Sequence, residues 1–307
     1  MSSYPDDNGN EDDDAVFEWY PARFLQDRPA APARPYAVIV LNQPLSCLRA
    51  IKRLWARASY RVAADGGANR LYDARAAAGE SFSDLDVIVG DLDSLRDETR
   101  AYFAQGGAPR ATAVVHDPDQ YSTDFGKAVR LVDRQRPGLH IVALGGLGGR
   151  VDQGVSQLHH LHVLQRPAAD DENGGNDDKR VQPTRTRHLY LLSSESLTWL
   201  LPPGRHRIHV REAATTAAAD KAEAENPTNH DDVDDDDDNT VFAKYVGILP
   251  LQGPSVITTR GLEWDVAAWP TQMGAQLSTS NHVLPTTRTV EVETSAAVVF
   301  TIALREP

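Results

Sequence analysis

Between residues 36 and 165 of this 307-residue chain, short apolar runs alternate with helical patterns, and this alternation constrains the fold more than any other feature. The apolar runs cover residues 36–41, 60–64, 86–89, 112–115 and 139–144. Helical stretches follow them at about 45–58, 68–78, 94–105, 123–135 and 152–165. Strands and helices in this order predict a mostly parallel sheet flanked by helices.

The C-terminal part of the chain has a different pattern. Strand-like runs lie at 187–192, 205–210, 241–249, 255–259, 275–279, 289–293 and 297–303, with no good helix among them. Strands that follow an α/β block in this way predict a separate all-β sandwich. We therefore expect an α/β domain over residues 35–166 and a β-sandwich domain over residues 187–307.

Acidic residues are concentrated in a few segments. The net charge is −13, but windows 1–14, 170–178 and 220–238 hold 21 of the 44 acidic residues and a single basic one, which leaves 30 basic against 23 acidic residues elsewhere. Such blocks repel themselves and cannot form a packed core, so we predict a disordered acidic and Pro-rich tail over 1–34, a polar insertion over 167–186 and a disordered acidic insertion at about 213–239. The mildly basic remainder suits a nucleotide but is too weakly charged for nucleic acid.

Composition excludes several other classes of protein. Hydrophobic residues make up 41% of the chain, and no apolar run approaches the roughly 20 residues that span a bilayer, so a membrane-spanning protein is not expected. The single cysteine, Cys47, cannot form an internal disulfide, and the acidic N-terminus lacks the pattern of a secretion signal. We therefore expect a cytoplasmic protein.

Carboxylates follow two of the predicted strands, at the edge of the sheet where ligands bind in open α/β folds. Asp91 and Asp93 come after the third strand, and in an extended segment their side chains would point the same way and share a cation such as Mg²⁺. Asp124 comes after the fourth strand and could complete that site or accept a proton. The alternative is helix capping, which we favour for Ser94.

Glycine-rich loops follow two other strands. Gly66 and Gly67 leave the second strand and enter a helix, where backbone N–H groups can approach an anion. Residues 145–149 after the fifth strand contain four glycines, and Arg150 beside them offers a guanidinium suited to phosphate. A flexible turn without a ligand is the alternative. The sequence has no GxxxxGK[ST], HExxH, CxxC or GxSxG motif, and His159, His160 and His162 are predicted to form a partly exposed helix face rather than a metal site.

Eight stretches together resemble motifs of the thiamine pyrophosphokinase (thiamine diphosphokinase) family. They are LNQPL at 41–45, ADGGANRLYD at 64–73, GDLDS at 90–94, PDQYSTDF at 118–125, LGGLGGRVDQ at 144–153, LLPPGRHRIHV at 200–210, GLEWDV at 261–266 and STSN at 278–281. The resemblance implies a homodimeric transferase in which the hydroxyl of thiamine takes the diphosphoryl group of ATP, giving thiamine diphosphate and AMP, with ATP as co-substrate and Mg²⁺ as cofactor.

The resemblance also implies roles for single residues. The implied catalytic residues are Asp91, Asp93, Asp124 and Arg150, of which the three carboxylates would also hold Mg²⁺. The implied ATP and diphosphate site consists of Asp65, Gly66, Gly67, Gln120, Thr123, Gly145, Gly146 and Asp152. The implied thiamine site consists of Trp264, Ser278 and Asn281, although an aromatic residue in the sandwich core is the alternative interpretation of Trp264.

Two other functions stay open at this point. An aspartyl-phosphate phosphohydrolase also carries an Asp-x-Asp pair after a strand, but Gly90 and Leu95 on either side of the pair speak against it. A thiamine- or nucleotide-binding sensor without catalytic activity would keep the same pocket. The intact set of carboxylates favours an enzyme.

Overall fold

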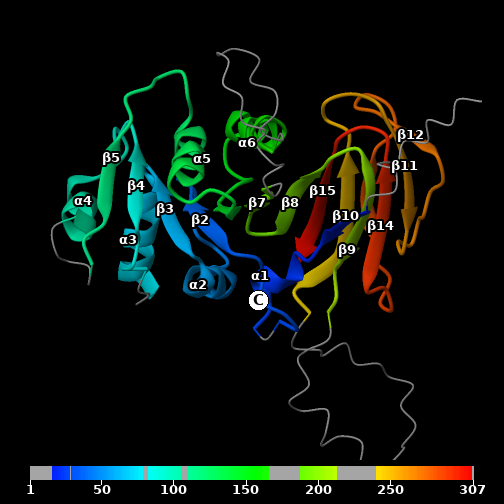
Figure 1. Ribbon diagram of the computed structural model, residues 1–307, viewed down its shortest axis with the longest axis horizontal. Coiled ribbons are helices and arrows are strands. Elements are labelled where there is room, and N and C mark those ends of the chain that lie inside the picture. Colours follow the sequence, from blue (N-terminus) through cyan, green and yellow to red (C-terminus); the bar gives the residue numbers. More distant parts are fainter. Residues whose placement is uncertain are drawn as a thin grey trace, which may run out of the picture. The chain divides into compact units, whose positions relative to one another are not determined.

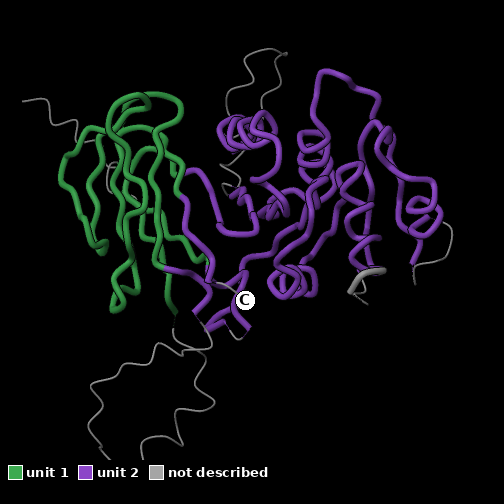
Figure 2. Tube along the Cα trace, turned by 180° about the vertical axis from the view of Figure 1, so that it is seen from behind, with its two compact units in different colours: residues 1–21, 201–212, 244–300 green, residues 22–200, 213–243, 301–307 purple. Residues whose placement is uncertain are grey.

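The computed structural model describes residues 16–27, 29–78, 82–104, 110–165, 187–212 and 240–305. Most of the predicted tail's acidic part and both predicted insertions lie outside these residues. The chain divides into two compact units, one made of residues 1–21, 201–212 and 244–300 and the other of residues 22–200, 213–243 and 301–307 (Figure 2).

The larger unit is built on the predicted parallel sheet. Its parallel strands are β2 (Tyr36–Val40), β3 (Tyr60–Ala64), β4 (Val87–Gly90), β5 (Ala113–His116), β6 (His140–Leu144) and β7 (Leu189–Leu192). Strand β8 (Ser196–Leu201) runs antiparallel to β7, and the strand order is β8-β7-β6-β2-β3-β4-β5. The predicted α/β class is confirmed.

Helices connect these strands. They are α2 (Leu48–Arg57), α3 (Gly67–Ala78), α4 (Asp97–Ala104), α5 (Asp124–Gln135) and α6 (Val151–Leu164). Helices α2 and α3 lie on one face of the sheet, and α5 and α6 lie on the other (Figure 1). After β5 the chain returns through α5 to β6, which lies on the far side of β2, so the order of strands reverses between β2 and β6. In open α/β sheets this reversal marks the crevice where ligands bind.

The core of this unit follows from its continuous apolar strands. Every residue of β2, β6 and β7 is buried, as expected of parallel strands covered on both faces. The residues of β5 are half-buried or exposed, because β5 is an edge strand of the sheet. None of the described helices is both long enough and apolar enough to cross a membrane.

Two boundaries differ from the sequence-based expectation. The predicted tail contains strand β1 (Val16–Trp19) and helix α1 (Ala22–Leu25), because Trp19 and Phe24 are apolar enough to be buried there. Strand β7, which we expected in the β-sandwich, belongs to the α/β unit because its four buried residues extend the parallel sheet beside β6.

The smaller unit is rich in β-structure, as predicted for the C-terminal part. One sheet has the order β1-β9-β14-β11-β12, formed with β9 (Gly204–His209), β14 (Thr289–Thr294), β11 (Ser255–Arg260) and β12 (Trp269–Thr271). Strands β13 (Ser278–His282), β10 (Phe242–Leu249) and β15 (Val298–Leu304) are hydrogen-bonded neighbours in that order. Ile208 and Val292 alternate with charged residues on their strands and are buried.

Candidate functional site

Three carboxylates from separate loops meet at the carboxyl edge of the parallel sheet. Asp65 follows β3, Asp91 follows β4, and Asp124 begins α5 after β5. One carboxylate oxygen from each residue lies within 4.8 Å of the others. Parallel strands end at the same edge of a sheet, so residues far apart in sequence converge there.

The backbone is shaped to let these groups approach one another. A side chain at Gly90 would bring its Cβ to 2.7 Å from Cβ of Asp65 and to 2.9 Å from Oδ1 of Asp124. Any residue other than glycine at this position would collide with the Asp65 and Asp124 side chains. Asp65 itself has a φ of 42°, a left-handed conformation that non-glycine residues rarely adopt and that is often found at functional sites.

Asp65 is buried, yet only one of its carboxylate oxygens is satisfied. Oδ2 accepts a hydrogen bond from the backbone N–H of Ser94 at 3.1 Å. Oδ1 is buried and has no hydrogen-bond partner within the described residues. A buried carboxylate oxygen without a donor is unfavourable unless a cation or another donor faces it.

A buried lysine accompanies the carboxylates. Lys127 lies one turn into α5 and is 1% exposed, and its Nζ is 3.3 Å from Oδ1 of Asp124 and 3.8 Å from Oδ2 of Asp91. Sequence reasoning missed this residue, although its i+3 spacing from Asp124 on one helix face was a usable signal. The cluster thus holds three carboxylates and one ammonium, which contacts two of them, so the group has an excess of negative charge.

That excess affects the pKa of Asp124. Burial of the carboxyl raises its pKa, the hydrogen bond from Lys127 lowers it, and repulsion by Asp91 and Asp65 raises it further, with a net rise above the ordinary value. Three oxygen ligands with surplus negative charge suit a hard divalent cation such as Mg²⁺. The residues at this edge therefore fit the implied cofactor.

Asp93 does not join this group of carboxylates. We expected Asp91 and Asp93 to point the same way from an extended segment, but Leu92 between them has a φ of 67°, which breaks the alternation. Asp93 is exposed, and its backbone N–H donates to Oδ1 of Asp91 at 3.2 Å. In the described residues, Asp65 is the third carboxylate beside Asp91 and Asp124.

Gln120 and Thr123 lie next to the carboxylates. Nε2 of Gln120 is 3.4 Å from Oδ2 of Asp91. Thr123 is the N-cap of α5, and its Oγ1 accepts the backbone N–H of Gly126 at 3.1 Å. The start of α5 thus presents Thr123 and Asp124 side by side at an end of the helix where anions are favoured.

The glycine loops pack against the loop that follows β2. A side chain at Gly66 would collide with the Asn42 side chain, and one at Gly67 would collide with the Val40 carbonyl. The glycines at the start of α3 are thus required by packing, whatever ligand they contact.

The second glycine loop lies beside the same segment. Gly145 has a φ of 75°, and a Cβ there would lie 2.8 Å from Cβ of Gln43. A Cβ at Gly146 would lie 2.7 Å from Cβ of Leu191. Gln43 therefore lines the loop at the reversal point between β2 and β6, and sequence reasoning did not single it out.

Arg150 and Asp152 pair with each other at the start of α6. Nε of Arg150 donates to Oδ1 of Asp152 at 3.1 Å, and a second guanidinium nitrogen donates to Oδ2 at 2.5 Å. Both side chains are exposed, and in the described part of the chain neither contacts the three carboxylates. The guanidinium is accessible and can exchange this partner for a phosphate.

In the smaller unit, Trp264 and Asn281 lie together. The Asn281 amide accepts the backbone N–H of Trp264 at 3.2 Å and donates to its carbonyl at 2.9 Å. The Trp264 side chain is 55% exposed, so it is not a core aromatic residue. Ser278 begins the strand that carries Asn281 and is half-buried.

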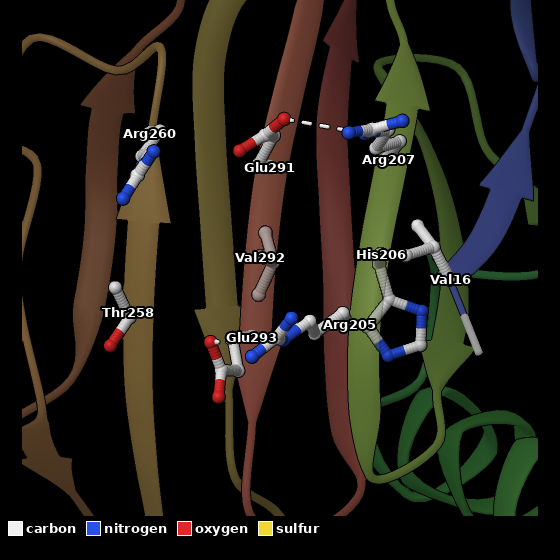
Figure 3. A pocket seen from close by; sticks show the side chains of 9 residues that line it. All are labelled: Val16, Arg205, His206, Arg207, Thr258, Arg260, Glu291, Val292 and Glu293. Atoms are coloured by element: carbon white, nitrogen blue, oxygen red, sulfur yellow. Dashed lines mark hydrogen bonds and ion pairs between the residues drawn. The ribbon is translucent and has the colours of Figure 1, made fainter. Parts of the chain in front are cut away.

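A hollow of about 280 Å³ lies on one face of the five-stranded sheet (Figure 3). Most of its charges are paired across strands, Arg207 with Glu291 at 3.3 Å and Arg205 with Glu293 at 3.6 Å. Paired, exposed charges of this kind indicate a solvated sheet face rather than a ligand site.

The parallel sheet with its cluster of three carboxylates and a nearby exposed arginine defines an α/β protein whose groups are suited to a divalent cation and phosphates. Residues 51–170 match the family described as "Thiamin pyrophosphokinase, catalytic domain", and residues 232–299 match "Thiamin pyrophosphokinase, vitamin B1 binding domain". Thiamine pyrophosphokinase 3 of Oryza sativa subsp. japonica is 30% identical over 286 residues, covering 88% of this chain and 87% of that protein. Thiamine pyrophosphokinase 1 of Arabidopsis thaliana is 30% identical over 287 residues, with coverages of 88% and 87%. The chain belongs to the thiamine pyrophosphokinase family.

Solved structures agree on the fold. The thiamin pyrophosphokinase from Candida albicans has a TM-score of 0.69 at 20% identity, covering 94% of this chain and 93% of that one. Yeast thiamin pyrophosphokinase has a TM-score of 0.67 at 20% identity, with coverages of 97% and 94%.

Proposed function

We propose that this chain is a thiamine pyrophosphokinase that transfers the diphosphoryl group of ATP to the hydroxyl of thiamine, giving thiamine diphosphate and AMP. Family membership supports the reaction. The observation that carries the proposal is the convergence of Asp65, Asp91 and Asp124 beside the buried Lys127. This group has the charge and the oxygen ligands that the chemistry requires.

Asp91, Asp124 and Asp65 would hold Mg²⁺. The exposed Asp93, beside Asp91, would contact the bound nucleotide. Mg²⁺ held there supplies charge neutralisation for the phosphates during transfer. Asp124 is also the carboxylate that could accept the proton of the thiamine hydroxyl.

The reaction then needs positioning more than covalent help from the protein. The thiamine hydroxyl oxygen attacks the β-phosphorus of ATP, the bond from that phosphorus to the oxygen of AMP breaks, and AMP leaves with the electron pair. Thr123 and the start of α5 would bind phosphate oxygens. The guanidinium of Arg150 would break its ion pair with Asp152 and neutralise the charge of those oxygens. Gln120 and the loops containing Gly66 and Gly145 would line the same site.

Trp264, Ser278 and Asn281 would form the thiamine site. The positive thiazolium ring of thiamine is attracted to an indole face by about 0.5–2 kcal/mol. The exposed Trp264 ring, with its backbone fixed by Asn281, offers such a face. We also propose a homodimer, on the family resemblance, which light scattering of the purified chain would test.

The test is to incubate the chain with ATP, Mg²⁺ and thiamine and to measure products. We expect AMP and thiamine diphosphate in equal amounts, and none without thiamine. Asp91→Asn should lower turnover by at least about a hundredfold while the protein still folds. Phosphate release from a phosphomonoester without ATP would indicate a phosphohydrolase, and ligand binding without AMP would indicate a sensor.

A further inference from the structure

His160 is a half-buried imidazole on α6 that the mechanism above does not use. Its Nε2 lies 2.9 Å from Oγ1 of Thr123, and its Nδ1 lies 2.6 Å from the carbonyl oxygen of Ser156. Its ring centre is 5.4 Å from that of Phe125. The histidine therefore ties α6 to the residue that caps α5, one position before Asp124.

The Ser156 carbonyl fixes the tautomer of this ring. A carbonyl oxygen only accepts hydrogen bonds, so Nδ1 of His160 carries a hydrogen. In the neutral ring Nε2 is then an acceptor, and the Thr123 hydroxyl must donate its single hydrogen to it. The same Oγ1 also accepts the N–H of Gly126. An exposed Thr123 in this state offers a ligand a lone pair but no hydrogen.

We propose that His160 is a positioning residue that decides whether the Thr123 hydroxyl can donate a hydrogen bond to a phosphate oxygen of bound nucleotide. This inference rests on the proposed function, which puts nucleotide phosphates at Thr123. When the ring takes up a proton from solvent, Nε2 becomes a donor to Oγ1. The hydroxyl then accepts from His160 and Gly126, and its own hydrogen is free for the phosphate. Nucleotide binding is thereby coupled to proton uptake by His160.

The surroundings of His160 favour the neutral ring in the absence of a ligand. Burial lowers its pKa, the Ser156 carbonyl raises it, and the neighbouring His159 and Arg130 lower it further, with a net fall. Arg130 lies 3.7 Å from the carboxylate of Asp119. A nucleotide phosphate at Thr123 would bring the negative charge that stabilises the protonated ring.

Calorimetry of ATP binding tests this coupling. The full chain is titrated with ATP and Mg²⁺, without thiamine, in buffers of different ionisation enthalpy between about pH 6 and 8, the range in which histidine titrates. We expect the unsubstituted chain to take up more protons per ATP than His160→Gln, whose amide can still bond Thr123 but cannot become charged. His159→Gln is the matched control and should keep the uptake of the unsubstituted chain.

The outcomes separate this inference from the proposed function. Equal proton uptake by the unsubstituted chain and His160→Gln would overturn the role of His160 and leave the proposed function standing. Absence of ATP binding by the unsubstituted chain would overturn the proposed function itself. If His160→Gln does not fold, NMR titration of the His160 ring decides, since its pKa should rise when ATP binds and an unchanged pKa would overturn the inference.

Discussion

At the scale of single residues, Lys127 is the buried counter-charge of the carboxylate cluster. Its Nζ contacts Asp124 and Asp91, and its side chain is almost completely buried. Removing one partner of a buried charged group leaves the others uncompensated, which is far less favourable than losing an exposed pair.

Lys127→Met should therefore lower the free energy of unfolding by about 2–4 kcal/mol in the presence of a chelator. Adding Mn²⁺ should restore part of this loss, because a cation that binds the folded state stabilises it. Lys127→Arg keeps the charge and is the matched control. Equal denaturation midpoints for Lys127→Met and the unsubstituted chain would rule out this role.

At the scale of elements, the site depends on how closely β4 approaches its neighbours. Gly90 ends β4, and the space beside it is filled by the Asp65 and Asp124 side chains. Gly154, near the start of α6, has open space instead, with no atom within 4 Å of an added Cβ.

Gly90→Ala should therefore push the carboxylates apart and lower turnover by at least about tenfold, since small misplacements of reacting groups are costly. Gly154→Ala is the control and should raise the free energy of unfolding by about 0.5–1 kcal/mol, because alanine is the better helix former. Kinetics and denaturation of both variants check this pair. Normal turnover of Gly90→Ala would mean that the close approach is not needed.

The strands differ in how well the sequence predicts them. The boundaries predicted for the continuous apolar strands β2 and β6 agree with the structure to within about a residue, because burial on both faces leaves a strong pattern. The short strands β1 and β12 were missed, since brief runs have no clear period, and the longer strand β8 was missed as well. In the site, Asp91 and Asp124 were found from their strand-end positions. The left-handed Leu92 that turns Asp93 aside has no signal in the sequence.

At the scale of the whole molecule, each unit contains a histidine that must stay neutral. In the smaller unit, Nδ1 of His206 accepts the indole N–H of Trp19 at 3.0 Å and Nε2 donates to the Pro202 carbonyl. In the larger unit, Nδ1 of His140 accepts the backbone N–H of His188 at 2.9 Å. Burial, above all, lowers the pKa of both rings to about 4.

The sign of the pH dependence follows from these values. The unfolded chain binds a proton at each histidine near pH 6.5, whereas the folded chain does so near pH 4. The contribution of each neutral histidine to the free energy of unfolding is thus fully present above pH 6.5. It is lost as the pH drops from 6.5 to 4, by up to about 3 kcal/mol for each histidine. Urea denaturation at about pH 7 and about pH 4.5 measures the change, and His206→Gln should reduce it. An unchanged free energy of unfolding over this range would contradict the prediction.

We propose that Asp65, Asp91 and Asp124 hold one divalent cation at the edge of the parallel sheet. Electron paramagnetic resonance of Mn²⁺ binding in the absence of nucleotide tests it most directly. We predict one bound ion for the unsubstituted chain, affinity weakened by at least about tenfold in Asp65→Asn, Asp91→Asn and Asp124→Asn, and a loss of less than about threefold in Asp93→Asn. Undiminished binding by Asp65→Asn, together with a loss confined to Asp93→Asn, would contradict the account.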